Sequence, residues 1–112
     1  MVGVGRNVRL IGGELDMDII DIPRGYGKTW MAIIRAKETG YPIIVNTIYN
    51  KGLLIKELHE YGCENIKVYT AKEWIEMRNK PEDQIIIDEL PMVLSNLFEA
   101  RVDLVTLSSK EY

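Results

Sequence analysis

The 112-residue sequence has one cysteine, one histidine and no long hydrophobic run. A lone Cys63 excludes an internal disulfide and a thiolate metal cluster, so we expect a small core residue in a reducing compartment. A lone His59 excludes a metal site built on histidines and is expected on a helix surface. No apolar run approaches the ~20 residues that span a bilayer, and the N-terminus lacks the apolar core of a signal peptide. We therefore expect a cytoplasmic protein without a membrane partner.

The chain also has no block of like charges. Its 14 Lys and Arg stand against 17 Asp and Glu, a net charge of −3, which gives no electrostatic sign of a strong nucleic-acid binder. At 46% hydrophobic and 28% charged residues, the composition is that of an ordinary globular domain. This length is expected to hold one domain, residues 1–112, without the second core of a two-domain motor protein.

Short apolar runs alternate with helical patterns, which predicts an α/β fold with a mostly parallel sheet and helical crossovers. The expected core strands are residues 18–22, 41–45, 66–69, 84–87 and 102–107. The run at 84–87 is wholly apolar after Gln84, which is typical of a strand buried on both faces. Asn7–Ile11 and Glu14–Ile22 flank Gly12-Gly13, which predicts an N-terminal hairpin; the alternative is that the second half simply runs on as a strand.

Four helices are expected between these strands. Their apolar residues are Trp30, Ile33, Ile34 and Ala36 in the first, Leu54, Leu58 and Tyr61 in the second, Trp74 and Met77 in the third, and Val93, Leu94, Leu97 and Phe98 in the fourth. The stop signals are Gly40 and Gly62, which follow the first and second helices. The start signals are Asn50 as a cap of the second helix, a capping-box pattern of Thr70 and Glu73 before the third, and Pro91 in the first turn of the fourth.

The most specific local signal is the segment Ile-Pro-Arg-Gly-Tyr-Gly-Lys-Thr at residues 22–29, between an expected strand and an expected helix. A phosphate-binding loop needs glycines there, because backbone amides must approach the phosphates closely at a helix N-terminus. Gly25 and Gly27 supply that room. Lys28 is expected to reach the outer phosphates, and the Thr29 hydroxyl to hold a magnesium ion. The pattern G-x-x-x-x-G-K-[ST] is broken at Ile22, and the alternative is a glycine-rich turn with an incidental Lys-Thr pair.

A second signal lies 60 residues after Lys28, where an isoleucine run ends in Asp88-Glu89. The tip of a parallel strand projects such side chains toward a phosphate loop, as in a Walker B motif. Asp88 is expected to bind magnesium, and Glu89 to orient and polarise the attacking water. The alternative is a strand end followed by the acidic first turn of the next helix.

The loop also matches the variant A-x-x-G-x-G-K-T at Pro23, Gly25 and the Gly-Lys-Thr ending. It thereby resembles the first motor domain of superfamily 1 and 2 helicases and of terminases, over Asp18–Ser109. The resemblance implies a three-layer P-loop NTPase with a five-stranded, mostly parallel core sheet, whose last strand lies between the strands of the two motifs. It implies nucleotide contacts from Pro23, Arg24, Gly25, Tyr26, Gly27, Lys28 and Thr29, magnesium ligation by Thr29 and Asp88, and catalytic roles for Lys28, Glu89 and Arg24. For Arg24 the alternative is a solvated loop residue.

Other polar residues fall where such helicases contact a nucleic-acid backbone or sense the γ-phosphate. Asn46-Thr47 follows the second core strand and Thr70 follows the third, at positions that resemble nucleic-acid contacts. The plainer interpretation of each is a polar turn residue at a strand-to-helix junction. The residues that resemble the γ-phosphate sensor are Thr106, Ser108 and Ser109, for which the alternative is a polar chain end.

Taken together, these patterns predict magnesium-dependent ATP binding with slow hydrolysis by a minimal helicase-like or terminase-like domain. We expect neither a second motor domain nor an arginine finger after the sensor strand, so self-assembly or a protein partner is expected to be needed for full activity. Nucleic acid is a further candidate partner. Similar short proteins occur in phage genomes, which would place the protein in the cytoplasm of a bacterial host. The alternative function is a non-catalytic phage or host interaction module that retains the P-loop fold.

Overall fold

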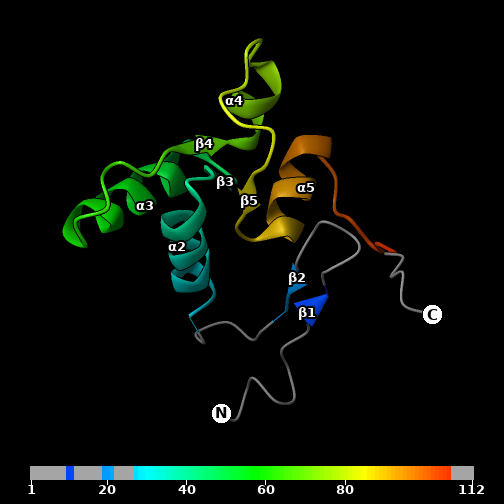
Figure 1. The fold of residues 1–112 in the computed structure, drawn as a ribbon. Coiled ribbons are helices and arrows are strands. Elements are labelled where there is room, and N and C mark those ends of the chain that lie inside the picture. Colours follow the sequence, from blue (N-terminus) through cyan, green and yellow to red (C-terminus); the bar gives the residue numbers. More distant parts are fainter. Residues whose placement is uncertain (1–9, 12–18, 22–26, 107–112) are drawn as a thin grey trace. The chain divides into compact units, whose positions relative to one another are not determined.

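The computed structural model describes residues 10–11, 19–21 and 27–106. The chain divides into two compact units, Met1–Lys28 with Asp103–Tyr112, and Thr29–Val102. Figure 1 traces the chain through both. No helix within the described ranges is long and apolar enough to cross a membrane.

The first unit contains an antiparallel pair of strands, β1 (Leu10–Ile11) and β2 (Ile19–Ile20). A hairpin in this region was predicted, but its turn was misplaced. The register sets Ile11 opposite Ile19, which a two-residue turn at Gly12-Gly13 does not give, and residues 12–18 themselves lie outside the described residues. A two-residue turn there would have set Ile11 opposite Glu14.

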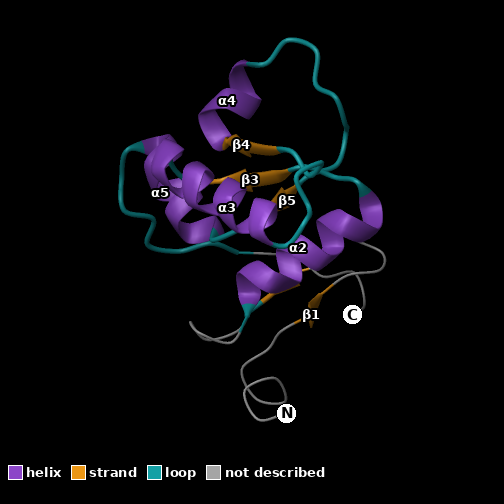
Figure 2. Cartoon of the chain, turned by 90° about the vertical axis from the view of Figure 1, so that its left-hand side faces the viewer, coloured by secondary structure: helices purple, strands orange, loops and turns teal. Residues whose placement is uncertain are grey.

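The second unit is built on a three-stranded parallel sheet in the order β4-β3-β5. These strands are β3 (Ile43–Val45), β4 (Val68–Thr70) and β5 (Ile86–Ile87). The helices are α2 (Lys28–Thr39), α3 (Ile48–Glu60), α4 (Ala71–Glu76) and α5 (Leu90–Phe98). Figure 2 shows the orange strands of this sheet side by side among the purple helices. The alternation of helices with parallel strands confirms the predicted α/β class.

β3 is the centre of the sheet, and both of its faces are buried. Successive side chains of a strand point to opposite faces, so Ile43 and Val45 face one side and Ile44 faces the other. The two core clusters divide in the same way, with α2 and α3 contributing to the first and α4 and α5 to the second. Helices therefore cover both faces of this sheet in three layers, with α2 and α3 to the left of the strands and α5 to the right in Figure 1.

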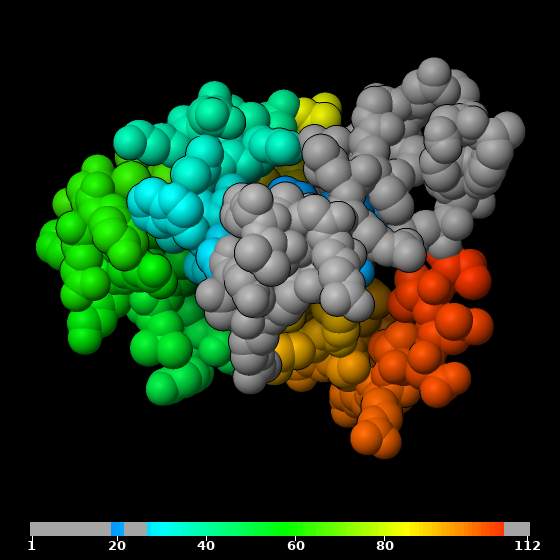
Figure 3. All heavy atoms as spheres, turned by 90° about the horizontal axis from the view of Figure 1, so that it is seen from below, coloured from blue at the N-terminus to red at the C-terminus, as the bar shows by residue number. Residues whose placement is uncertain are grey.

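The layer of α2 and α3 buries one apolar stripe from each helix. The buried residues of this cluster are Ile33, Ala36, Ile43, Val45, Leu54, Leu58, Cys63 and Val68. The predicted core role of Cys63 is confirmed, since it is 6% exposed. In Figure 3 the cyan atoms of α2 adjoin the green atoms of α3. Burial of a side chain such as Leu58 stabilises the fold by about 1.5–3 kcal/mol.

The layer of α4 and α5 packs on the opposite face of β3. Its buried residues are Ile44, Ala71 and Val93, with Tyr69, Trp74, Ile85 and Leu97 half-buried around them. Tyr69 and Trp74 form a tilted aromatic pair with ring centroids 5.6 Å apart. The side-chain amide of Asn96 donates to the carbonyl of Asn46 at 3.1 Å, which ties α5 to the end of β3.

The helix boundaries follow local chemistry. α2 and α3 are followed by Gly40 and Gly62, whose φ angles of 82° and 72° favour glycine. The predicted cap at Asn50 is wrong, because α3 begins three residues earlier: the Thr47 hydroxyl accepts from the Asn50 amide at 3.1 Å. Pro91 lies in the first turn of α5, as predicted.

Several predicted burials and one strand are not found. Trp30 and Tyr61 are 46% and 54% exposed, and they pack edge to face against each other at a centroid distance of 5.1 Å, outside both core clusters. Ile87 is 41% exposed rather than buried on both faces, since β5 has one described neighbour strand, β3. Residues 102–106 have no regular secondary structure, with Leu104 76% exposed. Within the described ranges, the parallel sheet therefore has three strands.

Candidate functional site

The start of α2 carries the described end of the predicted phosphate loop. Gly27 has a φ of 84°, a conformation that an L side chain adopts only under strain, and it directly precedes the helix. Lys28 and Thr29 are the first two residues of α2, and both are half-buried. The other predicted loop contacts, Pro23, Arg24, Gly25 and Tyr26, lie outside the described residues.

A hydrogen bond joins the two sequence motifs. The Thr29 hydroxyl donates to Oδ2 of Asp88 at 3.1 Å, although 59 residues separate them along the chain. Asp88 directly follows β5, and its backbone amide donates to the carbonyl of Ile44 at 3.0 Å. β3 thus fixes the backbone of Asp88, and α2 brings Thr29 to its carboxylate.

Glu89 occupies an unusual backbone position beside this pair. It is the N-cap of α5, with φ 62° and ψ 61° in the left-handed region, and its carbonyl accepts from the amides of Met92 and Val93 at 3.1 Å each. Its side chain makes no capping hydrogen bond to α5. A left-handed conformation costs a residue with a Cβ roughly 1–2 kcal/mol. Strained residues of this kind gather at functional sites, so the backbone adds an observation that the sequence did not predict.

The chemistry of the Thr29–Asp88 pair suits a hard cation. A hydroxyl and a carboxylate supply oxygen ligands, which magnesium prefers, and magnesium commonly takes only one or two protein ligands beside water and phosphate. Lys28, adjacent to Thr29, adds a positive charge that suits an anionic ligand. The residues present therefore fit the predicted metal.

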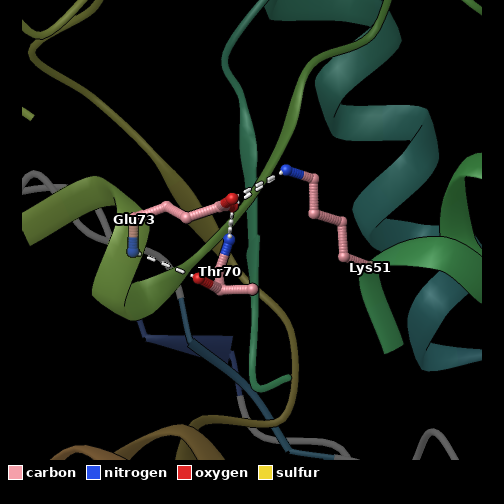
Figure 4. A network of polar contacts seen from close by, with 3 residues as sticks. All are labelled: Lys51, Thr70 and Glu73. Carbon is pink, nitrogen blue, oxygen red and sulfur yellow. Dashed lines mark hydrogen bonds and ion pairs between the residues drawn. The ribbon is translucent and has the colours of Figure 1, made fainter. Parts of the chain in front are cut away.

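Two other predicted contact residues at this edge of the sheet act as helix caps. The Thr47 hydroxyl caps α3, and the Thr70 hydroxyl accepts from the amide of Glu73 at 3.1 Å. Glu73 completes the box, since its Oε1 accepts from the Thr70 amide at 2.9 Å (Figure 4). The predicted capping box is confirmed, and so is the strand-to-helix turn role of both threonines. A nucleic-acid contact at either threonine stays a prediction.

Lys51 extends the capping box across to α3. Its Nζ lies 2.9 Å and 3.1 Å from the two carboxylate oxygens of Glu73 (Figure 4), and 6.0 Å from the centroid of the Tyr69 ring. The hydrogen bond from Lys51, followed by that from the Thr70 backbone, lowers the pKa of Glu73 below its ordinary value. This network joins α3, β4 and α4 at the carboxyl ends of the strands.

A groove at the same edge was not predicted from the sequence. It has a volume of about 440 Å³ and is lined by Asn46, Thr47, Pro91, Met92, Ser95 and Asn96. The sequence signal was the polar pair Ser95-Asn96 within the otherwise apolar pattern of α5.

The other residues singled out in the sequence are His59, Thr106, Ser108 and Ser109. His59 is on the surface, as predicted, and its Nδ1 lies 3.2 Å from a carboxylate oxygen of Glu64. Thr106 is exposed, and Ser108 and Ser109 lie outside the described residues. No model of a known protein family, no curated protein and no solved structure matches this chain.

Proposed function

We propose that the chain binds magnesium ATP at the start of α2 and hydrolyses it slowly, as a minimal P-loop domain of the helicase-like and terminase-like class. In this proposal the three described parallel strands belong to the five-stranded core that the sequence predicts. The observation that carries the proposal is the 3.1 Å hydrogen bond from the Thr29 hydroxyl to Asp88.

This hydrogen bond supports the proposal because each motif was identified separately. A glycine-rich turn with an incidental Lys-Thr pair gives no reason for Thr29 to meet an acidic residue 59 positions away. A nucleotide site needs that meeting, since the hydroxyl and the carboxylate have to share one magnesium ion. The position of Asp88 at the carboxyl end of a parallel strand agrees, because ligands of open α/β sheets bind there.

Each residue then has a distinct task. The Lys28 ammonium pairs with the outer phosphates, and the loop amides at the N-terminus of α2 donate to them. Glu89 orients and polarises the attacking water as the water approaches the γ-phosphorus in line. Magnesium held by Thr29 and Asp88 would supply positive charge that stabilises the transferred phosphoryl group.

Slow turnover is inferred from the cations that the two sequence motifs contribute, which are Arg24 and Lys28. An arginine delivered to the γ-phosphate is worth roughly 10³–10⁵ in rate in comparable enzymes. Arg24 is near in sequence, and Arg101 is an exposed candidate for a neighbouring subunit. We infer a basal rate of about 10⁻² per second or less, well below the ordinary range, which self-assembly, a protein partner or nucleic acid raises.

Calorimetric titration with magnesium ATP or ADP tests the site. Lys28→Ala and Thr29→Val should each weaken binding about tenfold or more, since a charge-assisted contact or a metal ligand is lost. The matched control is Thr39→Val at the exposed other end of α2, where the hydroxyl donates to the carbonyl of Arg35. Equal affinity in wild type and Lys28→Ala would overturn the site.

Phosphate release then separates an ATPase from an interaction module. It is measured over a range of protein concentrations, with and without single-stranded and double-stranded nucleic acid, on wild type and Glu89→Gln. An ATPase loses release in Glu89→Gln, and its rate climbs more than linearly with concentration or on adding a partner. Nucleotide binding without release above that of Glu89→Gln would favour the non-catalytic module.

A further inference from the structure

We draw no further inference here: the strongest candidate, the groove between the end of β3 and the start of α5, is an open surface, and nothing in the structure shows what covers it.

Discussion

The left-handed backbone of Glu89 leads to a stability difference of unusual sign. At most positions glycine is less stabilising than alanine, because the unfolded glycine chain has more freedom to lose. At Glu89, with φ 62°, the order should reverse. Glycine has no Cβ to strain in this conformation, whereas alanine keeps that strain. We therefore expect Glu89→Gly to be more stable than Glu89→Ala.

The size of the difference follows from two opposing terms. A left-handed residue with a Cβ costs roughly 1–2 kcal/mol, and the extra unfolded-state freedom of glycine costs about 0.5–1 kcal/mol. The net advantage of glycine over alanine is then about 0–1.5 kcal/mol and centres on about 0.75 kcal/mol. Both variants lack the carboxylate of Glu89, so the comparison isolates the backbone from every contact of the side chain.

Urea unfolding measures this difference as a shift in midpoint at constant slope. Glu99, the C-cap of α5, is the matched positive control, since its φ of 53° lies in the same region. Lys56, an exposed residue inside α3, is the negative control, and there alanine should exceed glycine by about 0.8–1 kcal/mol.

Phosphate release measured on the same proteins separates function from fold. Glu89→Gly should lose release while its backbone is relieved of strain, whereas Glu99→Gly should keep release. Such a trade of stability against activity marks a strained functional residue. If glycine proves less stable than alanine at Glu89 but more stable at Glu99, the left-handed assignment at Glu89 is refuted, and with it the strain argument.

Three further changes test the fold around the site. Thr70→Val removes the cap acceptor of α4 at nearly constant shape and should cost about 1 kcal/mol in urea unfolding, whereas Thr70→Ser should retain most of that stability. Because the pKa of Glu73 is lowered in the folded chain, its pair with Lys51 stabilises the fold above the unfolded-state pKa and loses this effect as pH falls through the lowered value. Wild type should accordingly lose more stability than Glu73→Gln between about pH 5 and 3, and parallel pH profiles would contradict the pairing. Leu58→Ala, at a position 1% exposed, should cost about 2–5 kcal/mol, and a cost near zero would place Leu58 outside the core.

Boundaries set by local chemistry were the most predictable part of the fold. The capping box of Thr70 and Glu73 depends on residues three positions apart, so the sequence contains the whole interaction. The same is true of Gly40 and Gly62, because a left-handed stop depends on one residue. Thr47 was missed as a cap because Asn50 is an equally good capping residue, and the choice between them depends on where α3 meets the sheet.

Burial was predicted less well, because a periodic stripe gives the direction of the core but not its width. Ile33 and Ala36 on α2 are buried, while Trp30 and Ile34 in the same pattern are 46% and 39% exposed. The reason is the short sheet beneath them, whose strands have two or three residues each in the described ranges. The sheet area on which α2 packs depends on pairing between distant segments, and the periodicity of one helix does not report that pairing.

The candidate site likewise has one feature that the sequence predicted and two that it did not. The contact between Thr29 and Asp88 could be expected from the two motifs, because a shared magnesium ion requires the hydroxyl of one and the carboxylate of the other to lie close together. The left-handed Glu89 and the groove could not be expected, because no residue type near Glu89 signals the conformation and the groove combines segments about 45 residues apart. The proximity of two distant segments can therefore be predicted from a sequence only where both belong to motifs that are known to act together.

The precision of the site depends on β3 more than on the length of β5. β5 has two residues, yet the amide of Ile86 donates to the carbonyl of Pro42 at 2.9 Å and that of Asp88 to Ile44 at 3.0 Å. The backbone of Asp88 is therefore held in register with β3 by two hydrogen bonds, one at Ile86 and one at Asp88 itself. β3 is itself held by buried side chains on both of its faces, so it resists displacement in either direction. A two-residue strand can thus place a carboxylate against Thr29 because the central strand supplies the rigidity.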